Sequence, residues 1–382
     1  MNTLDTIRTD NVGSLLRPAA WKEARVRMDG GLISAEEFHA IEMDCIRKAV
    51  AMQEGAGMEV ITDGEISRLN FQDSFGLSVG GYDNPKQDIL KLHEKRAEGA
   101  KAMARWDIPD LDGQGTPVSH RRPVLERIFL ARNVPVEEYK RVAPLATKPV
   151  KVSLVGPDRV AQRFDHQKSK AIYADQDAFM ADLVALQRKI ISGLVAAGCR
   201  YVHIDEPGYT AYVDKQSLDI MRSRGEDPQA NFARSLKANA EIIKGFPGVT
   251  FGVHVCRGNQ ASMWHREGTY DDIAERMFNE LPFNRFLLEY DSERAGSFEP
   301  LRFVPKGKVV VLGLISTKVP KMESIDDLKR RVNEATKYLP LEQLALSPQC
   351  GFGSDIVGNL ITEDDQKRKI ELMLEAARQI WA

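Results

Sequence analysis

His254 and Cys256 stand two residues apart at the end of the apolar run 250–256. In a β-strand, residues i and i+2 point to the same face, so an imidazole and a thiol would project from one strand end toward one point. Both groups are accepted zinc ligands, and a tetrahedral site would need only one or two more donors from elsewhere in the chain. The pair therefore indicates a metal site and a reaction class together.

Two residues at other strand ends complete a candidate ligand set. Glu289 lies within the apolar segment 286–290, where a carboxylate is costly to bury unless it is paired or coordinated. Cys350 follows the last apolar run of the chain. We expect these two residues to bind one zinc ion together with His254 and Cys256. The alternative for any one of them is an ordinary core residue.

The charges of this ligand set favour a particular chemistry. Two thiolates, one carboxylate and a neutral imidazole around Zn²⁺ sum to about −1, which makes a weak Lewis acid for activating water. A thiol substrate suits such a centre, because it would lose its proton on coordination and remain nucleophilic. We expect a zinc-bound thiolate to attack an electrophilic carbon, with Glu289 yielding its position to the incoming sulfur.

A second polar set could bind or process a substrate. Asp205 and Glu65 end two other predicted strands, and they could hold an ammonium group or act as general acid and base. Ser14 and the adjacent backbone N–H groups could hold a carboxylate. The alternatives are a helix N-cap for Asp205 and a surface charge paired with Arg68 for Glu65.

Four arginines lie near predicted strand ends, at Arg8, Arg17, Arg68 and Arg257. An arginine-lined mouth would favour an anionic partner such as a sulfonate, a carboxylate or a phosphate. Arg17 and Arg257 are our candidates for substrate binding. Solvation at the surface is the alternative for each arginine.

Eight short β-rich runs alternate with amphipathic helical patterns. The predicted strands are 9–14, 59–65, 149–155, 201–206, 250–256, 285–290, 309–316 and 344–347. The predicted helices are 34–55, 176–197, 229–244, 324–338 and 363–380, with Ser34, Ser324 and Thr362 as N-caps. This alternation implies a parallel sheet, and a closed (β/α)8 TIM barrel is the expected solution.

The barrel should span residues 1–382 as a single domain, with 76–147 as an insertion after the second strand. That stretch is too long for a simple βα loop, and we interpret it as a cap over one end of the barrel or as a peripheral decoration. A doubly wound open sheet is the alternative fold, but no Gly-x-Gly-x-x-Gly follows the first strand.

Composition excludes several classes of protein. The chain has 382 residues, of which 43% are hydrophobic and 28% charged, as in ordinary globular proteins. A net charge of −2 gives no support for nucleic-acid binding. No apolar run approaches the ~20 residues that would span a membrane, and the N-terminus lacks an apolar signal core, so we expect a cytoplasmic protein. Cys45 and Cys199 are expected to be core residues. The sequence does not decide between a monomer and an oligomer.

The chain resembles the C-terminal catalytic barrel of cobalamin-independent methionine synthase, in a short single-barrel form. The matching segments run in family order over residues 9–353: Val12-Gly-Ser14, Asp63-Gly-Glu65, Val155-Gly-Pro157, His203-Ile-Asp-Glu-Pro207, His254-Val-Cys256, Glu289 and Ser347-Pro-Gln-Cys-Gly351. The resemblance implies a catalytic zinc held by His254, Cys256, Glu289 and Cys350. It also implies that Ser14, Glu65 and Asp205 hold the amino-acid part of homocysteine during methyl transfer.

Two departures from the family pattern concern the methyl donor. Segment 314–320 lacks the family's histidine at the end of the seventh strand, and Arg257-Gly-Asn259 replaces an aromatic-rich segment. The residues expected to bind zinc and the thiol therefore match the family pattern, whereas the residues expected to face the electrophile differ from it. We expect an S-alkyltransferase acting on homocysteine or a similar small thiol, with a methyl or alkyl donor other than folate, such as a corrinoid protein.

Three alternative functions follow from the same residues. A thiol transferase could use an epoxide as its electrophile, as in relatives that resemble epoxyalkane–coenzyme M transferases. A zinc hydrolase with Asp205 or Glu65 as base ranks lower, because two thiolates weaken the activation of water. A purely structural zinc site would have its ligands closer together in the sequence.

Overall fold

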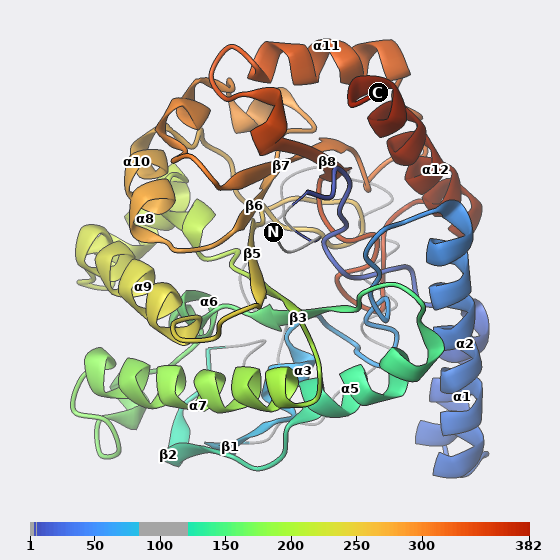
Figure 1. Cartoon of the computed structure of the whole chain (residues 1–382). Helices are drawn as coiled ribbons and strands as arrows, with labels where there is room; N and C mark the ends of the chain where they lie inside the picture. Colours follow the sequence, from blue (N-terminus) through green and yellow to red (C-terminus); the bar gives the residue numbers. More distant parts are fainter. Residues whose placement is uncertain (1–3, 5, 84–120) are drawn as a thin grey trace.

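The computed structural model describes residue 4, residues 6–83 and residues 121–382. Its centre is a parallel sheet in which six strands follow one another in chain order (Figure 1). The strands are β3 (Lys151–Val155), β4 (Tyr201–Asp205), β5 (Thr250–Val255), β6 (Arg285–Glu289), β7 (Val309–Ile315) and β8 (Leu344–Pro348). Every residue of these strands is buried, as expected for a parallel sheet covered on both faces.

The two expected N-terminal strands, 9–14 and 59–65, occupy the remaining positions of the ring but are not regular strands. Thr9 forms a single parallel bridge with Leu346 of β8, and Ile61 forms one with Val150 beside β3. The side chain of Gln53 binds the Thr62 backbone in place of a neighbouring strand, with distances of 3.0 Å to the amide and 2.8 Å to the carbonyl. The prediction that 9–14 and 59–65 are regular strands was therefore wrong, although each segment lies where a strand of the barrel is expected.

The two segments nevertheless contact each other and complete the ring. The Leu15 amide donates to the Gly64 carbonyl at 2.9 Å, and the Thr62 hydroxyl donates to the Gly13 carbonyl at 2.6 Å. The fold is thus the expected (β/α)8 barrel rather than a doubly wound open sheet.

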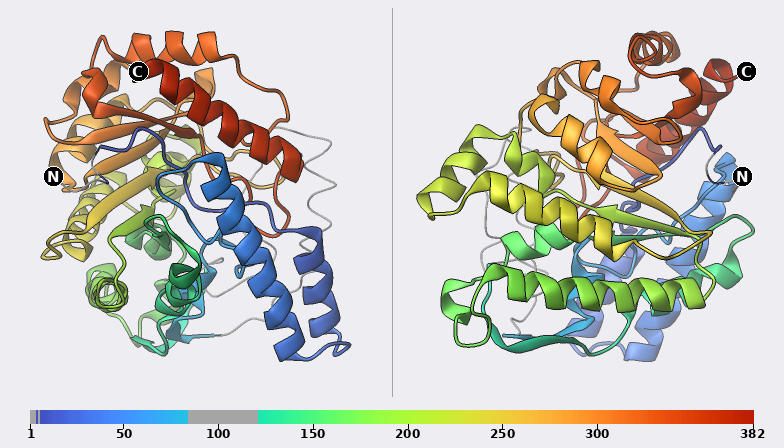
Figure 2. Two further views of the ribbon diagram at one scale, coloured as in Figure 1. Left: turned by 45° about the vertical axis from the view of Figure 1, so that its right-hand side comes forward. Right: turned by 60° about the vertical axis from the view of Figure 1, so that its left-hand side comes forward.

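Helices surround the sheet on its outer face (Figures 1 and 2). The longer ones are α1 (Ala19–Asp29), α2 (Ala35–Ala56), α7 (Gln176–Ala196), α9 (Pro228–Ile242), α10 (Asp271–Glu280), α11 (Ile325–Ala335) and α12 (Glu363–Ile380). The shorter ones are α3 (Asp73–Gly76), α5 (Val134–Val142), α6 (Pro157–Gln162) and α8 (Lys215–Ser223).

The predicted helix starts are confirmed by the side-chain caps. Ser34 and Thr362 each form a capping box, in which the cap side chain binds a backbone amide three residues on and an acidic side chain binds the cap amide in return. Ser324 accepts a hydrogen bond from the Asp327 amide at 3.1 Å. Local sequence therefore fixes where α2, α11 and α12 begin.

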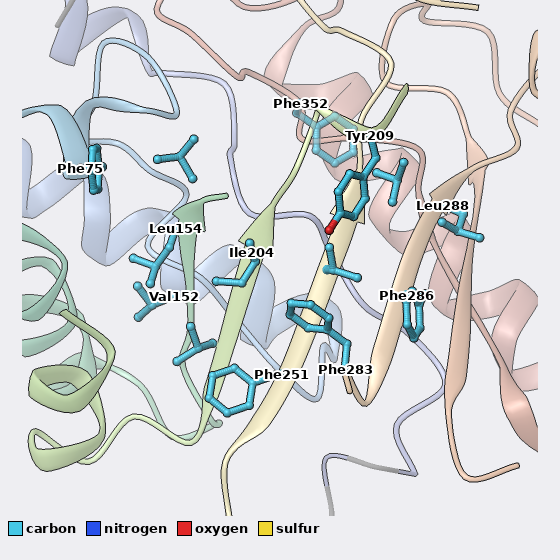
Figure 3. Close-up of a cluster of buried hydrophobic side chains, with 14 of the residues drawn as sticks. Phe75, Val152, Leu154, Ile204, Tyr209, Phe251, Phe283, Phe286, Leu288 and Phe352 are labelled. Carbon is cyan, nitrogen blue, oxygen red and sulfur yellow. The ribbon is translucent and has the colours of Figure 1, made fainter. Parts of the chain in front are cut away.

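Two apolar layers hold the barrel together. Alternate strand residues, such as Ile204 and Phe286, pack outward against the helices in the larger cluster (Figure 3). The intervening positions face inward, where Leu287, Val311 and Ala345 belong to a smaller cluster. Side chains alternate along a strand, so the inward-facing side chains at the strand ends do not pack in the outer apolar layer. Polar groups can therefore occupy these positions.

The stretch 76–147, expected as an insertion, is described only in part, because residues 84–120 lie outside the described residues. Its described portions include β1 (Val79–Tyr82), which pairs antiparallel with β2 (Val124–Leu130), and the helix α5. Among the described residues, no helix has the length and apolar character needed to cross a membrane.

Candidate metal centre and substrate site

The four predicted metal ligands come together at the carboxyl ends of the strands. His254 is on β5 and Cys256 directly follows it, Glu289 ends β6, and Cys350 follows β8. One potential ligand atom from each side chain lies within 4.8 Å of all the others. All four residues are buried, and the two sulfur atoms are 3.5 Å apart without a disulfide. Such a compact set of one nitrogen, two sulfurs and one carboxylate matches the donors that zinc prefers.

The imidazole of His254 is oriented as a metal ligand would be. Its Nδ1 lies 3.1 Å from the Leu287 carbonyl, which can only accept, so Nδ1 carries the proton and Nε2 carries the lone pair. Nε2 is fully buried and has no hydrogen-bond partner among the described residues. A buried nitrogen with a free lone pair, aimed at two thiols and a carboxylate, fits a bound cation.

The electrostatics of the cluster also favour a cation. Although burial alone would lower the pKa of His254, Cys256, Asp205 and Glu289 raise it to about 9, so these groups favour a positive charge at Nε2. That charge can be a proton or, in its place, a metal ion bound to the Nε2 lone pair of the neutral imidazole. The adjacent sulfur of Cys350, together with burial, raises the pKa of Cys256 well above its usual range. The Cys256 thiol therefore resists ionising unless a positive charge lies beside it, which a zinc ion would supply.

Glu289 is held by several donors besides its place in the cluster. Its Oε1 accepts from the Arg257 amide at 2.5 Å, and its Oε2 accepts from Gln349 at 2.8 Å and Arg294 at 3.2 Å. Burial would raise the pKa of Glu289, but the charges of Arg294, Lys318 and His254 lower it. The carboxylate thus stays ionised in a site where it is completely buried.

Glu65 and Asp205 form the second group of polar side chains that the sequence indicated. Glu65 has a left-handed backbone with φ of 54°, and its amide donates to Asp63 Oδ1 at 2.8 Å. One carboxylate oxygen of Glu65 and one of Asp205 are buried without a partner among the described residues. Burial raises the pKa of Glu65 to about 7 and that of Asp205 to about 6. Two such oxygens could accept hydrogen bonds from an ammonium group.

Ser14 lies against the loop that carries Cys350. A Cβ atom added to Gly351 would stand 1.9 Å from the Ser14 hydroxyl oxygen, and the Phe352 amide donates to the Ser14 carbonyl at 2.8 Å. The segment after Val12 is therefore fixed beside the metal cluster. This contact explains why a glycine follows Cys350.

The predicted arginine-lined mouth is wrong in part. Arg8 donates to the Glu342 and Leu344 carbonyls at the start of β8, which is the opposite end of the barrel from the metal cluster. Arg68 is 2% exposed and binds Glu138 through two hydrogen bonds of 3.0 and 2.8 Å. Arg8 precedes the first barrel segment, and Arg68 is neutralised by a residue far along the chain, so neither could be placed from local sequence.

Arg17 and Arg257, our candidates for substrate binding, are both buried. Arg17 is 3% exposed and donates to the Arg68 carbonyl at 3.0 Å and the Leu15 carbonyl at 3.1 Å. The Arg257 guanidinium is completely buried and lies 4.5 Å from the centre of the Tyr270 ring. Their roles toward a substrate stay predictions.

Sequence reasoning missed several residues around the cluster. Gln349 and Arg294 hold Glu289, and Lys318 donates to Gly258 O and Asn259 Oδ1, both at 2.8 Å. Gln349 stands next to Cys350 and could have been inferred from that position. The others come from loops whose paths the sequence does not reveal.

Comparison with known proteins places these observations in a family. The profile described as "Cobalamin-independent synthase, Catalytic domain" matches residues 7–104 and 94–379. The uncharacterized protein YxjH of Bacillus subtilis is 33% identical over 98% of this chain and 94% of its own. Methionine synthase of Pyrococcus abyssi is 22% identical over 91% of this chain and 87% of its own. A solved structure, the putative vitamin-B12-independent methionine synthase of Listeria monocytogenes, has a TM-score of 0.74 and 25% identity, with 98% of each chain covered.

Proposed function

The chain belongs to the family of cobalamin-independent methionine synthase catalytic domains, which makes it a transferase, and on that premise we propose that it alkylates a small thiol bound to zinc. The proposed reaction is methyl transfer to homocysteine or a closely similar thiol. The observation that carries the proposal is the buried set of two thiols, one carboxylate and one imidazole with a free lone pair.

In this proposal His254, Cys256, Glu289 and Cys350 hold the metal. Bound zinc would lower the pKa of a coordinated substrate thiol while its electron-rich ligands keep the thiolate nucleophilic. Glu289 is the ligand that can give way to a thiol, because Gln349, Arg294 and the Arg257 amide already bind its two oxygens. Its charge would not be left unpaired when it moves.

The chain's other residues orient the amino-acid part of the thiol. Glu65 and Asp205 each offer a buried carboxylate oxygen to the substrate ammonium group. Ser14, which lies against Gly351 beside Cys350, offers its hydroxyl and nearby amides to the carboxylate. The same contacts would keep the thiol at a fixed distance from the metal ligands.

We also propose that residues 1–382 form one barrel domain and that 76–147 is an insertion within it. The described part of that stretch supports this, because β1 and β2 pair with each other rather than with the barrel sheet.

The second substrate in the proposed reaction is the alkyl donor, which could be folate, a corrinoid protein or a small electrophile.

The proposal is tested by turnover of homocysteine with three separate donors: methyltetrahydrofolate as the monoglutamate, methylcobalamin and an epoxide. We expect methyl transfer from methylcobalamin and none from the folate, because the seventh strand end lacks a histidine. Efficient use of the folate would show that our interpretation of that strand end is wrong.

Cysteine variants test the metal site itself. Cys350→Ser should lose stoichiometric zinc, whereas Cys45→Ser should keep it, because Cys45 is buried in α2 outside the cluster. Retention of zinc and activity in Cys350→Ser would contradict the proposed site.

A further inference from the structure

A cavity of about 140 Å³ lies at the same end of the barrel as the candidate metal centre, among the helices and loops that follow β3, β4 and β5. Its walls include apolar side chains, among them Met180, Ala211 and Met221, and several arginines. Two of these arginines, Arg159 and Arg266, are only 7% and 8% exposed. The cavity therefore combines an apolar wall with buried positive charge.

Neither of the two guanidinium groups forms an ion pair with a carboxylate in the described part of the chain. Arg159 Nε donates to Gln72 Oε1 at 3.0 Å. Arg266 donates through Nη2 to Gln162 Oε1 at 3.2 Å and through Nη1 to the Pro207 carbonyl, while its buried Nε has no hydrogen-bond partner there. Buried guanidinium groups with only neutral acceptors usually indicate a missing anion.

The carboxylates whose charges act on these two arginines are bound by other donors. Asp214 accepts from the Ser217 amide at 2.8 Å, the Ser217 hydroxyl at 2.7 Å and the Glu267 amide at 3.2 Å. Glu206 accepts from the Asp158 amide at 3.1 Å, the Arg159 amide at 2.9 Å and Asn239 at 3.0 Å. Asp158 accepts from the Tyr212 hydroxyl at 2.9 Å. Burial raises the pKa of Asp158 and of Glu206, so these two carboxyls compensate the arginines weakly.

The like charges around Arg159 also favour an anion. Burial, followed by the nearby charges of Arg163 and Arg266, lowers the pKa of Arg159 well below its usual range. An oxyanion between Arg159 and Arg266 would relieve this repulsion and could accept hydrogen bonds from both planar groups.

The loop that carries Arg266 is connected to the segment after β5, which holds Cys256. The Arg266 amide donates to the Arg257 carbonyl at 3.2 Å, one residue from Cys256. The Thr210 hydroxyl lies 2.8 Å from the Cys256 carbonyl and 3.1 Å from the Pro207 carbonyl, which Arg266 also binds. Burial lowers the pKa of Arg266, although the charges of Asp214 and Asp158 act in the opposite direction. The loop that carries Arg266 is therefore fixed at the same end of the barrel as the metal ligands.

We propose that Arg159 and Arg266 form an oxyanion-binding subsite for the alkyl donor. The donor class is a small molecule, or a part of a larger one, with an apolar body and a terminal carboxylate, sulfonate or phosphate. This inference rests on the proposed function, since Ser14, Glu65 and Asp205 are assigned to the thiol and leave the cavity to the second substrate.

The probe for this subsite is butanesulfonate, with 1-butanol as the neutral control of equal chain length, both measured by isothermal titration. We expect the sulfonate to bind and the alcohol to show no binding. Arg159→Gln and Arg266→Gln should each weaken sulfonate binding by about tenfold or more, because each removes charge-assisted hydrogen bonds. Arg224→Gln makes the same change at an exposed wall residue of the cavity and should stay within about twofold of wild type.

Equal binding of the sulfonate by wild type and by both buried-arginine variants would overturn the proposal. Competition between homocysteine and the sulfonate would also overturn it, because the subsite would then belong to the thiol. Circular dichroism and zinc content, measured on every variant, establish that the fold and metal site are intact. If homocysteine fails to bind while sulfonate binding still depends on Arg159 and Arg266, the thiol-transfer proposal falls and the anion subsite stands.

Discussion

Replacement of Arg68 by methionine should destabilise the protein strongly. The Arg68 guanidinium is 2% exposed and donates to Glu138 at 3.0 and 2.8 Å and to the Ser153 carbonyl at 3.1 Å. It also lies 3.4 Å from Glu65 Oε1. Removing it leaves two carboxylates buried without their cation. Breaking a buried pair in this way costs about 3–5 kcal/mol.

The assay is urea unfolding followed by far-UV circular dichroism, compared with the exposed pair of Arg47 and Asp44. Arg47 is 58% exposed and 3.1 Å from Asp44, so Arg47→Met should cost about 0–1 kcal/mol. The double variant with Arg68→Met and Glu138→Leu lacks one of the two carboxylates that would be buried without a cation. It should therefore recover about half of the free energy of unfolding that Arg68→Met loses. If Arg68→Met unfolds at the same urea concentration as Arg47→Met, our account of this buried network is refuted.

Further predictions concern the substrate site. Gly351→Ala should weaken homocysteine binding at least about tenfold, because the new Cβ would stand 1.9 Å from the Ser14 hydroxyl oxygen. Gly55→Ala, in α2 with nothing within 4 Å, should bind homocysteine normally and be more stable by about 0.5–1 kcal/mol. Affinity for the product methionine, measured by titration calorimetry, should rise with pH through about 7, because Glu65, with a pKa raised by burial to about 7, binds the ammonium group only when ionised. Glu65→Gln should remove the rise near 7 and leave only the rise through about 6 that ionisation of Asp205 produces; a rise near 7 that persists in the variant would show that another group controls binding.

Local patterns in the sequence were sufficient to predict most of the framework. The cap residues Ser34, Ser324 and Thr362 act within one helical turn, and the confirmed strands are short, fully buried runs rich in apolar residues. The segments 9–14 and 59–65 were mistaken for regular strands, because side-chain contacts such as that of Gln53 with Thr62 replace strand pairing there. Such contacts depend on the tertiary fold and leave no periodic signal.

Some residues of the candidate site could likewise be predicted from local sequence, and others could not. His254 and Cys256 are predictable because a strand sends residues i and i+2 to one face. Arg294 and Arg266 are not, because their positions depend on how long loops return to the barrel mouth. Arg68 was predicted to be available to a substrate because it lies near a strand end. Its guanidinium is instead bound to Glu138.

The central claim is that His254, Cys256, Glu289 and Cys350 hold one zinc ion that accepts a substrate thiol. Zinc X-ray absorption spectroscopy of the purified protein, with and without homocysteine, tests it most directly. We predict about one zinc per chain with two sulfur neighbours, rising to three when homocysteine is added and remaining at two when homoserine replaces it. A sulfur count that does not change with homocysteine, or zinc without sulfur neighbours, would contradict the account.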